Sequence, residues 1–412
     1  MRQVPMISFA RYGALFRVPD LKAIAIASVI GRLPIGIAGL AIMLMMQAAT
    51  GSFADSGIAT AGYIGGLAAL APLVGRRIDR HGPRGMLTLS MLIHPAAMAG
   101  LIVCALLHAP KPLLGLVAFV AGASYPPITV CMRTLLRQLL QDDERLQAAY
   151  SLESVLIETI FIAGPMLVAL FVAMAHPAAA VAFAALCAVL GTWMFLRSPA
   201  MHRWKLEPPR HSSLLGPLTT PGFVPLLCVT LFYCAGFGLF EIGVTGYAAE
   251  NGAPWLAGVM LGLASVGSAS GALAYGSRTW SWPLKRQYVV ALACMGAGCV
   301  VLSLSAHGLV FALVSVLAGL AMSPPLIMQS MLVARIARAE HATEAFTWST
   351  TALLAGVGLG IAAGGAILES RASSAVFLAA GMLALLACAI AAVLIRTQRA
   401  PSAQENLPNK AS

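Results

Sequence analysis

Twelve apolar segments, each long enough to cross a lipid bilayer, constrain this chain more than any other feature. A helix needs about twenty apolar residues to span the ~30 Å hydrocarbon layer. Only 10% of the 412 residues are charged, whereas soluble domains carry roughly 25% charged residues. The sequence therefore predicts an all-α polytopic membrane protein. We place its spans at 22–49, 57–75, 86–107, 112–133, 146–174, 178–197, 223–248, 254–276, 287–306, 308–334, 343–368 and 373–395.

The two halves of the chain repeat each other. The segments AGASYPPITVCMRTLLRQ and AGLAMSPPLIMQSMLVAR each carry a proline pair deep inside an apolar run. The pairs are Pro126-Pro127 and Pro324-Pro325, 198 residues apart, and an arginine follows each pair's second proline by ten residues. Proline removes a backbone donor and bends a helix. Matched prolines therefore indicate helix bends in a duplicated bundle, which is typical of transporters.

One polar segment separates the halves. It contains five prolines and a cluster of basic residues. We expect an N-terminal six-helix bundle at 1–197, a cytoplasmic linker at 198–222, a C-terminal six-helix bundle at 223–395 and a cytoplasmic tail at 396–412. The internal repeat makes the two bundles pseudo-symmetric.

The placement of charge predicts the orientation in the membrane. The net charge is +11. With a cytoplasmic N-terminus, all but three of the 26 basic residues fall in inner segments; the exceptions are Lys111, Arg371 and Arg32. This bias is the positive-inside rule. It places both termini in the cytoplasm and argues against nucleic acid as the partner of the positive charge.

A motif between the second and third spans resembles a family signature. The segment GRRIDRHGPRGML is similar to the Gly-x-x-x-Asp-Arg-x-Gly-(Arg)-Arg loop of the major facilitator superfamily. The matching residues are Gly75, Asp79, Arg80, Gly82 and Arg84. A weaker copy, YGSRTWSWPLKR, occurs in the second half, where alignment of AGYIGGLAALAPLVG with AGVMLGLASVGSASG puts Tyr275 at the acidic position. The resemblance covers essentially residues 20–395.

The resemblance implies a fold, a gate and a cavity. The fold is that of the superfamily, with twelve helices in two six-helix bundles. The loop motif is expected to hold the bundles together in the outward-facing state. The first, fourth, seventh and tenth spans are expected to line a midplane cavity. The side chains nominated for the cavity are Tyr125, Thr129, Phe232, Tyr233 and Gln329.

Four ionisable residues lie within spans and are candidates for proton or charge coupling. A charge in hydrocarbon costs at least a few kcal/mol, so such residues are functional candidates by default. They are Arg32, Glu153, Glu158 and Glu241. At ~1.5 Å of rise per residue, Arg32 and Glu158 are both near the midplane, and we expect them to pair. Glu153 is shallower and is oriented ~140° away from Glu158.

The eight cysteines all fall within spans and include no CxxC pair. We expect them to be buried, reduced packing residues rather than disulfides or metal ligands. The sequence predicts no cofactor and no metal.

These features favour a secondary transporter of the bacterial drug or metabolite efflux type. We expect a monomeric, multi-pass protein of the cell (inner) membrane that exports small amphipathic molecules in exchange for protons. An importer or facilitator of a small nutrient on the same fold is the alternative. An enzyme is not expected, because the chain has no HExxH, GxSxG or P-loop motif. A channel is disfavoured because no segment resembles a selectivity filter.

Overall fold

The computed structural model describes residues 10–15, 17–18, 20–51, 53–140, 142–206, 216–253, 255–305 and 308–397. Within these ranges all regular structure is helical, and twelve helices or helix pairs are long and apolar enough to cross a membrane. The prediction of an all-α protein with twelve spans is confirmed. The second span extends to His81, further than predicted, so Asp79 lies in a helix.

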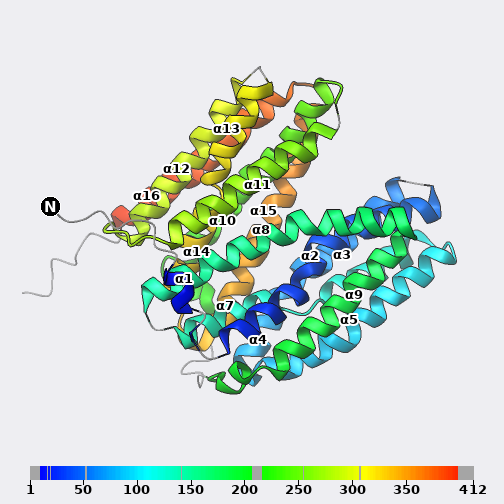
Figure 1. Cartoon of the computed structure of the whole chain (residues 1–412), viewed down its shortest axis with the longest axis horizontal. Helices are drawn as coiled ribbons and strands as arrows, with labels where there is room; N and C mark the ends of the chain where they lie inside the picture. The colour runs from blue at the N-terminus through cyan, green and yellow to red at the C-terminus, as the bar shows by residue number, and fades with distance from the viewer. Residues whose placement is uncertain are drawn as a thin grey trace, which may run out of the picture.

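Residues of the first half form nine helices (Figure 1). They are α1 (Ala10–Leu15), α2 (Leu21–Thr50), α3 (Phe53–Ala69), α4 (Ala71–His81), α5 (Pro83–Leu106), α6 (Lys111–Ala123), α7 (Ile128–Leu139), α8 (Asp143–Met174) and α9 (Pro177–Arg197).

Seven α-helices and three short 3-10 helices follow among the described residues. They are η1 (Pro199–Arg203), η2 (Gly216–Thr219), α10 (Phe223–Glu250), α11 (Trp255–Gly276), α12 (Leu284–Ser303), α13 (Gly308–Leu320), α14 (Ser323–Ile336), η3 (Ala339–His341), α15 (Ala342–Leu368) and α16 (Ser373–Thr397).

Both proline pairs interrupt their spans, as predicted. Pro126 and Pro127 lie in the break between α6 and α7, where Pro127 is the residue that precedes α7. Pro324 and Pro325 instead lie in the first turn of α14, after a short break that follows α13. A first turn tolerates proline because its N–H groups have no partner within the helix. The fourth and tenth spans are therefore each two helices joined at a bend.

The apolar core is shared at one end of the molecule and divided at the other. One cluster of buried side chains draws residues from both halves, from Tyr12 to Ala391. The second cluster contains only residues within 37–185, and the third contains only residues within 239–380. Two bundles consequently meet at one end and diverge toward the other (Figure 1). We call these the closed end and the open end.

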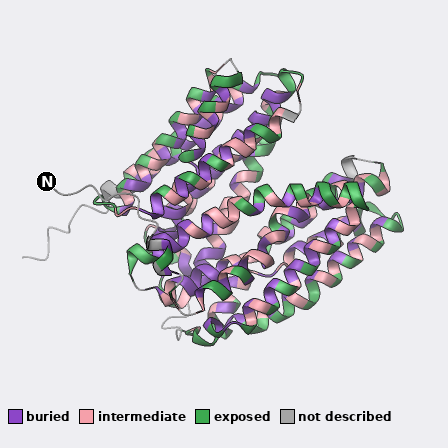
Figure 2. Cartoon of the chain, viewed as in Figure 1, coloured by how far each residue is buried: buried purple, intermediate pink, exposed green. Residues whose placement is uncertain are grey.

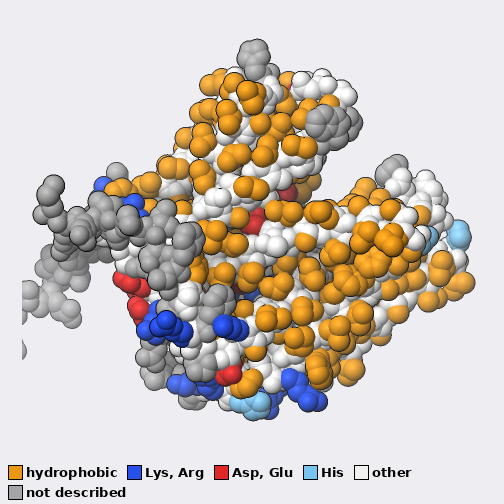
Figure 3. Space-filling model, viewed as in Figure 1, with side chains coloured by type: hydrophobic (Ala, Val, Ile, Leu, Met, Phe, Trp, Pro, Cys, Tyr) orange, Lys and Arg blue, Asp and Glu red, His pale blue; other side chains and the backbone are white. Residues whose placement is uncertain are grey.

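Burial follows the demands of a lipid environment. Exposed and partly buried positions cover the outer faces of the helices, while buried positions follow their inner faces (Figure 2). Large apolar side chains cover much of the visible surface (Figure 3); Leu73, Leu92 and Leu116 are each at least 60% exposed. Lipid tails solvate such side chains, so apolar exposure carries no penalty here.

Small residues let the helices approach closely. A Cβ on Gly191 of α9 would overlap the backbone of Gly31 in α2, and a Cβ on Gly31 would overlap the side chain of Ile128. A Cβ on Gly164 of α8 would likewise overlap the backbone of Gly36 in α2. Without a hydrophobic drive between helices in lipid, close packing of this kind supplies the attraction.

All eight cysteines are free, as predicted. The prediction that they are all buried is wrong for Cys228 and Cys294, which are exposed, and for Cys104 and Cys388, which are partly buried. An apolar residue can face lipid as readily as another helix, so location within a span does not determine burial.

The contact between α2 and α9 gives a prediction. Gly191→Ala should destabilise the protein by about 1–3 kcal/mol, because the new methyl group meets backbone that cannot rotate away. Thermal unfolding of the purified protein in detergent measures the effect. Gly39→Ala is the matched control, because a Cβ there has no neighbour within 4 Å. Equal melting temperatures for the two variants would contradict this account of the packing.

Candidate functional site

The closed end is built where helices of one bundle begin or end against the other bundle. Helix α4 packs on α15, α8 packs on α11 and α14, and α7 contacts α15. A notch separates the two lobes of the molecule and widens away from this end (Figure 3). In this view the cleft between the bundles opens toward the open end, and the inter-bundle contacts lie at the opposite end.

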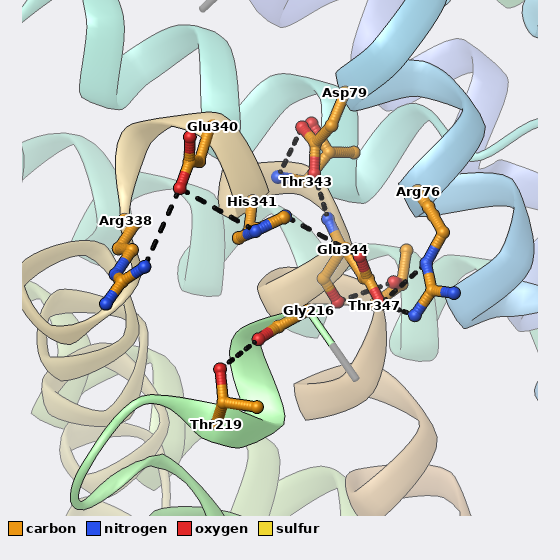
Figure 4. Close-up of polar contacts among 10 residues, drawn as sticks. All are labelled: Arg76, Asp79, Gly216, Thr219, Arg338, Glu340, His341, Thr343, Glu344 and Thr347. Atoms are coloured by element: carbon orange, nitrogen blue, oxygen red, sulfur yellow. Dashed lines mark hydrogen bonds and ion pairs between the residues drawn. The ribbon is translucent and has the colours of Figure 1, made fainter. Parts of the chain in front are cut away.

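Asp79 caps a helix of the opposite bundle. Its two carboxylate oxygens accept hydrogen bonds from the backbone N–H groups of Thr343 (2.9 Å) and Glu344 (2.7 Å) (Figure 4). These N–H groups belong to the first turn of α15 and have no partner within the helix. The positive end of the helix dipole also favours a carboxylate. The acidic residue of the motif therefore has a definite structural partner at the closed end.

The same contact depends on two neighbours of Asp79. A Cβ on Gly75 would overlap the side chain of Thr347 and the backbone of Glu344, so glycine is needed for α4 to approach α15. Arg76 donates to Glu344 Oε1 from Nη2 at 2.6 Å and from Nε at 3.1 Å (Figure 4). Glu344 is only 1% exposed. Arg76, which the motif comparison did not single out, contributes an ion pair between the bundles.

The other motif residues do not join this contact. Gly82 has a positive φ of 82° and forms the sharp turn between α4 and α5. Arg80 and Arg84 are exposed, and neither makes a hydrogen bond or ion pair with another described residue. Of the five motif residues predicted for the gate, the structure brings Gly75 and Asp79 to the other bundle.

The linker and the start of α15 surround Glu344. Gly216, at a φ of 50°, lies against the Glu344 carboxylate. His341 lies 3.8 Å from Glu340 and 3.9 Å from Glu344, measured from ring nitrogen to carboxylate oxygen (Figure 4). The described part of the predicted linker thus packs on the inter-bundle contact.

A second contact, between α8 and α11, mirrors the first. The side-chain amide of Gln147 donates to the carbonyl oxygens of Tyr275 (2.7 Å) and Arg278 (3.2 Å), and Tyr12 donates to that of Leu273 (3.0 Å). The carbonyls of Leu273 and Tyr275 lie in the last turn of α11, where the last four carbonyls have no partner within the helix, and Arg278 follows that end by two residues. The C-terminal end of a helix is the negative end of its dipole, so hydrogen-bond donors bind here, whereas a carboxylate binds the N-terminal end of α15.

The packing corrects the alignment of the two halves. Gly66 of the second span lies against the carbonyl of Phe119, and Gly267 of the eighth span lies against the carbonyl of Val316. These matching contacts make Gly66 equivalent to Gly267. The two spans are therefore aligned with a shift of five residues from the alignment based on sequence. Gly75 then corresponds to Gly276, which packs on Ser151 of α8. The residue equivalent to Asp79 is then Trp280. The prediction that Tyr275 occupies the acidic position of the second motif copy is wrong.

The arginines that follow the proline pairs also bind across the interface. Arg137 donates to the carbonyl oxygen of Ala337 at the end of α14 (2.8 Å). Arg335 pairs with Asp143 in the first turn of α8 (2.5 Å). Thr134 and Thr343 meet between these contacts, with 3.3 Å between their hydroxyl oxygens. The repeat detected in the sequence thus ends in matched contacts at the closed end.

The predicted pair between Arg32 and Glu158 is wrong. Arg32 Nη1 lies 3.1 Å from Glu153 Oε1, and Arg133 Nε lies 3.3 Å from each Glu153 oxygen. All three side chains are nearly completely buried. Five residues along α8 rotate Glu158 away from this cluster. Depth alone predicted the pair, whereas the direction of each side chain decides it.

Glu158 instead reaches the opposite bundle. Its Oε1 accepts hydrogen bonds from Ser268 of α11 (2.6 Å) and Ser323 of α14 (3.3 Å). Ser323 is the first residue of α14, next to the Pro324-Pro325 break. Glu241 of α10 is close enough to interact electrostatically with Glu158. Glu241 forms no hydrogen bond or ion pair with another described residue.

The nominated cavity residues fall into two groups. Tyr125 donates to the carbonyl oxygen of Gly31 within the first bundle (2.8 Å). Tyr233 donates to Gln329 (2.6 Å), whose amide nitrogen donates to Ser349. Thr129 and Phe232 are partly exposed and have no polar partner among the described residues. Hydrogen bonds already fix Tyr125, Tyr233 and Gln329 within their own bundles.

Besides Arg76, three residues of the closed end and cleft were missed by sequence reasoning. Arg133 was assigned to the inner basic segments, although it lies one turn after Thr129 in the bent fourth span. Gln147 and Glu344 were not considered. Both are polar residues in the first two turns of a span, and that position could have indicated an inter-bundle role.

Comparison with known proteins agrees with this architecture. Residues 24–283 match the family model described as Major Facilitator Superfamily. No curated protein matches the sequence. At 14% identity and a TM-score of 0.76, the chain resembles the outward-facing crystal structure of a bacterial homologue of the iron transporter ferroportin, over 91% of this chain and 99% of that chain.

Two further solved structures have similar folds. One is the human organic anion transporter MFSD10 (TETRAN), with 17% identity and a TM-score of 0.70 over 90% of this chain and 99% of that chain. The other is the proton:xylose symporter XylE bound to 6-bromo-6-deoxy-D-glucose, with 14% identity and a TM-score of 0.70 over 92% and 95%. At these identities the likeness establishes the fold alone.

The cap on α15 gives a prediction. Asp79→Ala should favour separation of the closed end, because it leaves two helix N–H groups without their acceptor. A cap of this kind contributes about 0.5–2 kcal/mol, so the ratio of closed to separated molecules should fall by roughly two- to thirtyfold. Electron paramagnetic resonance distances between labels at Arg77 and Arg338 measure that ratio in a background without native cysteines. Arg80→Ala is the control, and equal distance distributions in the two variants would exclude the capping role.

Proposed function

This chain belongs to the major facilitator superfamily, and on that premise we propose that it is a secondary active transporter that exports small amphipathic molecules across the cytoplasmic membrane in exchange for protons. The observation that carries the proposal is the position of Glu158. It is an acid within a membrane span, it lies between the two bundles, and only hydroxyl groups of the other bundle bind it among the described residues.

The charge distribution supports a cytoplasmic closed end. Arg76, Arg137 and Arg335 all lie at the closed end, and basic residues accumulate on the cytoplasmic side of membrane proteins. Both termini then lie in the cytoplasm, and the conformation described is outward-facing. The similarity to an outward-facing structure supports the same orientation.

In this orientation the cleft admits protons from outside. A proton taken up by Glu158 turns a charged acceptor into a neutral acid, which removes the cost of holding a buried charge while the bundles move. Separation of the caps at the closed end then opens the cleft to the cytoplasm. Release of the proton there restores the carboxylate, and a substrate molecule binds for the outward step. Glu241 is near enough to share this role.

The remaining candidates have specific places in the cycle. Gly75, Asp79 and Arg76 hold the closed end. The paired proline breaks allow the inner parts of the fourth and tenth spans, α7 and α14, to reorient separately from α6 and α13. Thr129, Phe232 and the Tyr233–Gln329 pair face substrate. The protein works as a monomer, because one chain supplies both bundles.

A second candidate function is import or facilitated entry of a small nutrient. The fold similarity to a proton:xylose symporter is the observation that favours it. Import would use the same closed end and the same acid, with proton and substrate moving in one direction.

The role of Glu158 is testable with Glu158→Gln, which retains the shape of the side chain but cannot titrate. Reconstituted vesicles under an imposed pH gradient should accumulate amphipathic compounds with the wild type, and the variant should lose dependence on the gradient while still exchanging substrate. Glu369→Gln, an exposed acid at the open end, is the control. Unchanged dependence on the gradient in Glu158→Gln would remove this residue from proton coupling.

A further inference from the structure

The buried cluster in the first bundle carries an uncompensated positive charge. Arg32 of α2 and Arg133 of α7 share the single carboxylate of Glu153 on α8. Arg32 is 2% exposed, Glu153 is 4% exposed and Arg133 is 5% exposed. No other acid forms an ion pair with either arginine among the described residues. With all three groups ionised, the cluster holds a net charge of one positive unit.

The hydrogen-bond donors in this cluster also outnumber the acceptors. Two guanidinium groups carry roughly ten N–H donors, whereas one carboxylate offers about four acceptor sites. The Nε of Arg32 is buried without a partner among the described residues. Neither Nη atom of Arg133 has a hydrogen-bond partner among the described residues, and Arg133 contacts Glu153 through Nε alone.

Arg133 lies on the part of α7 where the two bundles meet. The next residue, Thr134, contacts Thr343 of α15 in the opposite bundle, and Tyr150, which donates to the carbonyl oxygen of Arg133, packs its ring against Phe346 of α15. Thr129 is one helical turn earlier on the same face of α7 and is partly exposed. Glu158, one and a half turns from Glu153, is oriented elsewhere and binds two serines instead. The unpaired donors are thus at the boundary of the first bundle rather than deep within it.

From these observations we propose that Arg133, with Arg32 behind it, forms an anion subsite, and that the transported molecules are amphipathic organic acids whose carboxylate occupies it. This inference rests on the transporter function proposed above and names its substrate class. A planar guanidinium binds carboxylate through two parallel N–H groups. An anion here supplies both the missing negative charge and the missing acceptors. The Tyr233–Gln329 pair and Phe232 contact the rest of the molecule.

Binding to the purified full-length protein tests this proposal independently of transport. The probes are benzoate, phenylbutyrate and octanoate, each compared with the amine of the same carbon skeleton by isothermal titration calorimetry in a methanesulfonate buffer that contains no carboxylate. Wild-type protein should bind at least one acid at least about tenfold more tightly than its amine. Absence of that preference in all the pairs would overturn the proposal, whether or not proton-coupled transport is observed.

Two substitutions separate a binding role from a structural one. Arg133→Gln should lower the affinity for the preferred acid by about tenfold or more. Glu153→Gln raises the net charge of the cluster and should increase that affinity, which a purely structural ion cluster would not do. Arg197→Gln is the control, because Arg197 lies over Trp193 at the end of α9, outside the site. Gel filtration verifies that each variant is folded.

Replacing methanesulfonate with chloride distinguishes an organic acid from an inorganic ion. If chloride displaces no bound acid at physiological concentration, the carboxylate assignment stands. If chloride binds and the acids do not, the site is for a free inorganic anion and the proposed substrate class is wrong. Should either glutamine variant fail to fold, the acid-over-amine preference of the wild type decides the question.

Discussion

The ends of three helices in the second bundle depend on side chains from the first bundle, and this dependence organises the closed end. A helix terminus has N–H or C=O groups without intrahelical partners, and in a membrane protein such groups must be satisfied by protein or by a water-filled space. Asp79 satisfies the beginning of α15, Gln147 satisfies the end of α11, and Arg137 satisfies the end of α14. Each residue has the chemistry that its terminus requires.

In the proposed transport cycle, this arrangement makes the closed end both specific and reversible. The bundles adhere through a few directional hydrogen bonds and two ion pairs, beside the shared part of the apolar core. When the bundles separate at the closed end, water can hydrogen-bond to the N–H and C=O groups of each exposed helix terminus. The cost of separation is therefore the modest difference between a protein partner and a water partner, about 0.5–1.5 kcal/mol for a typical hydrogen bond. Conformations that differ by such amounts can interconvert during a transport cycle.

The sequence predicts the fold well, because lipid imposes its requirements on every span. Twelve apolar runs and the helix breaks at the proline pairs each have a local physical cause and are found as predicted. The pairing of charges was not predictable in the same way. The similar depths of Arg32 and Glu158 in the membrane predicted that these two residues pair. In the structure, Arg32 pairs with Glu153, because Glu153 and Glu158 project in different directions from α8. Rotation of a helix about its axis depends on packing with several neighbours, which a single sequence does not specify.

The second half of the chain illustrates the same limit. Residue identity suggested one alignment of the repeats, while the close approaches at Gly66 and Gly267 establish another. The first bundle supplies both an acid and an amide to the second, so the two inter-bundle contacts are equivalent in position but different in chemistry. A search for a second acidic motif could not find Gln147, because that helix terminus requires a donor.

Alternating access through the closed end is the central claim, and a reversible cross-link between Thr134 and Thr343 tests it most directly. Their hydroxyl oxygens are 3.3 Å apart across the interface, so a cysteine at each position should form a disulfide with little movement of the backbone. In a background without native cysteines, oxidation should abolish vesicle transport and reduction should restore it. Undiminished transport with the cross-link fully formed would contradict the account.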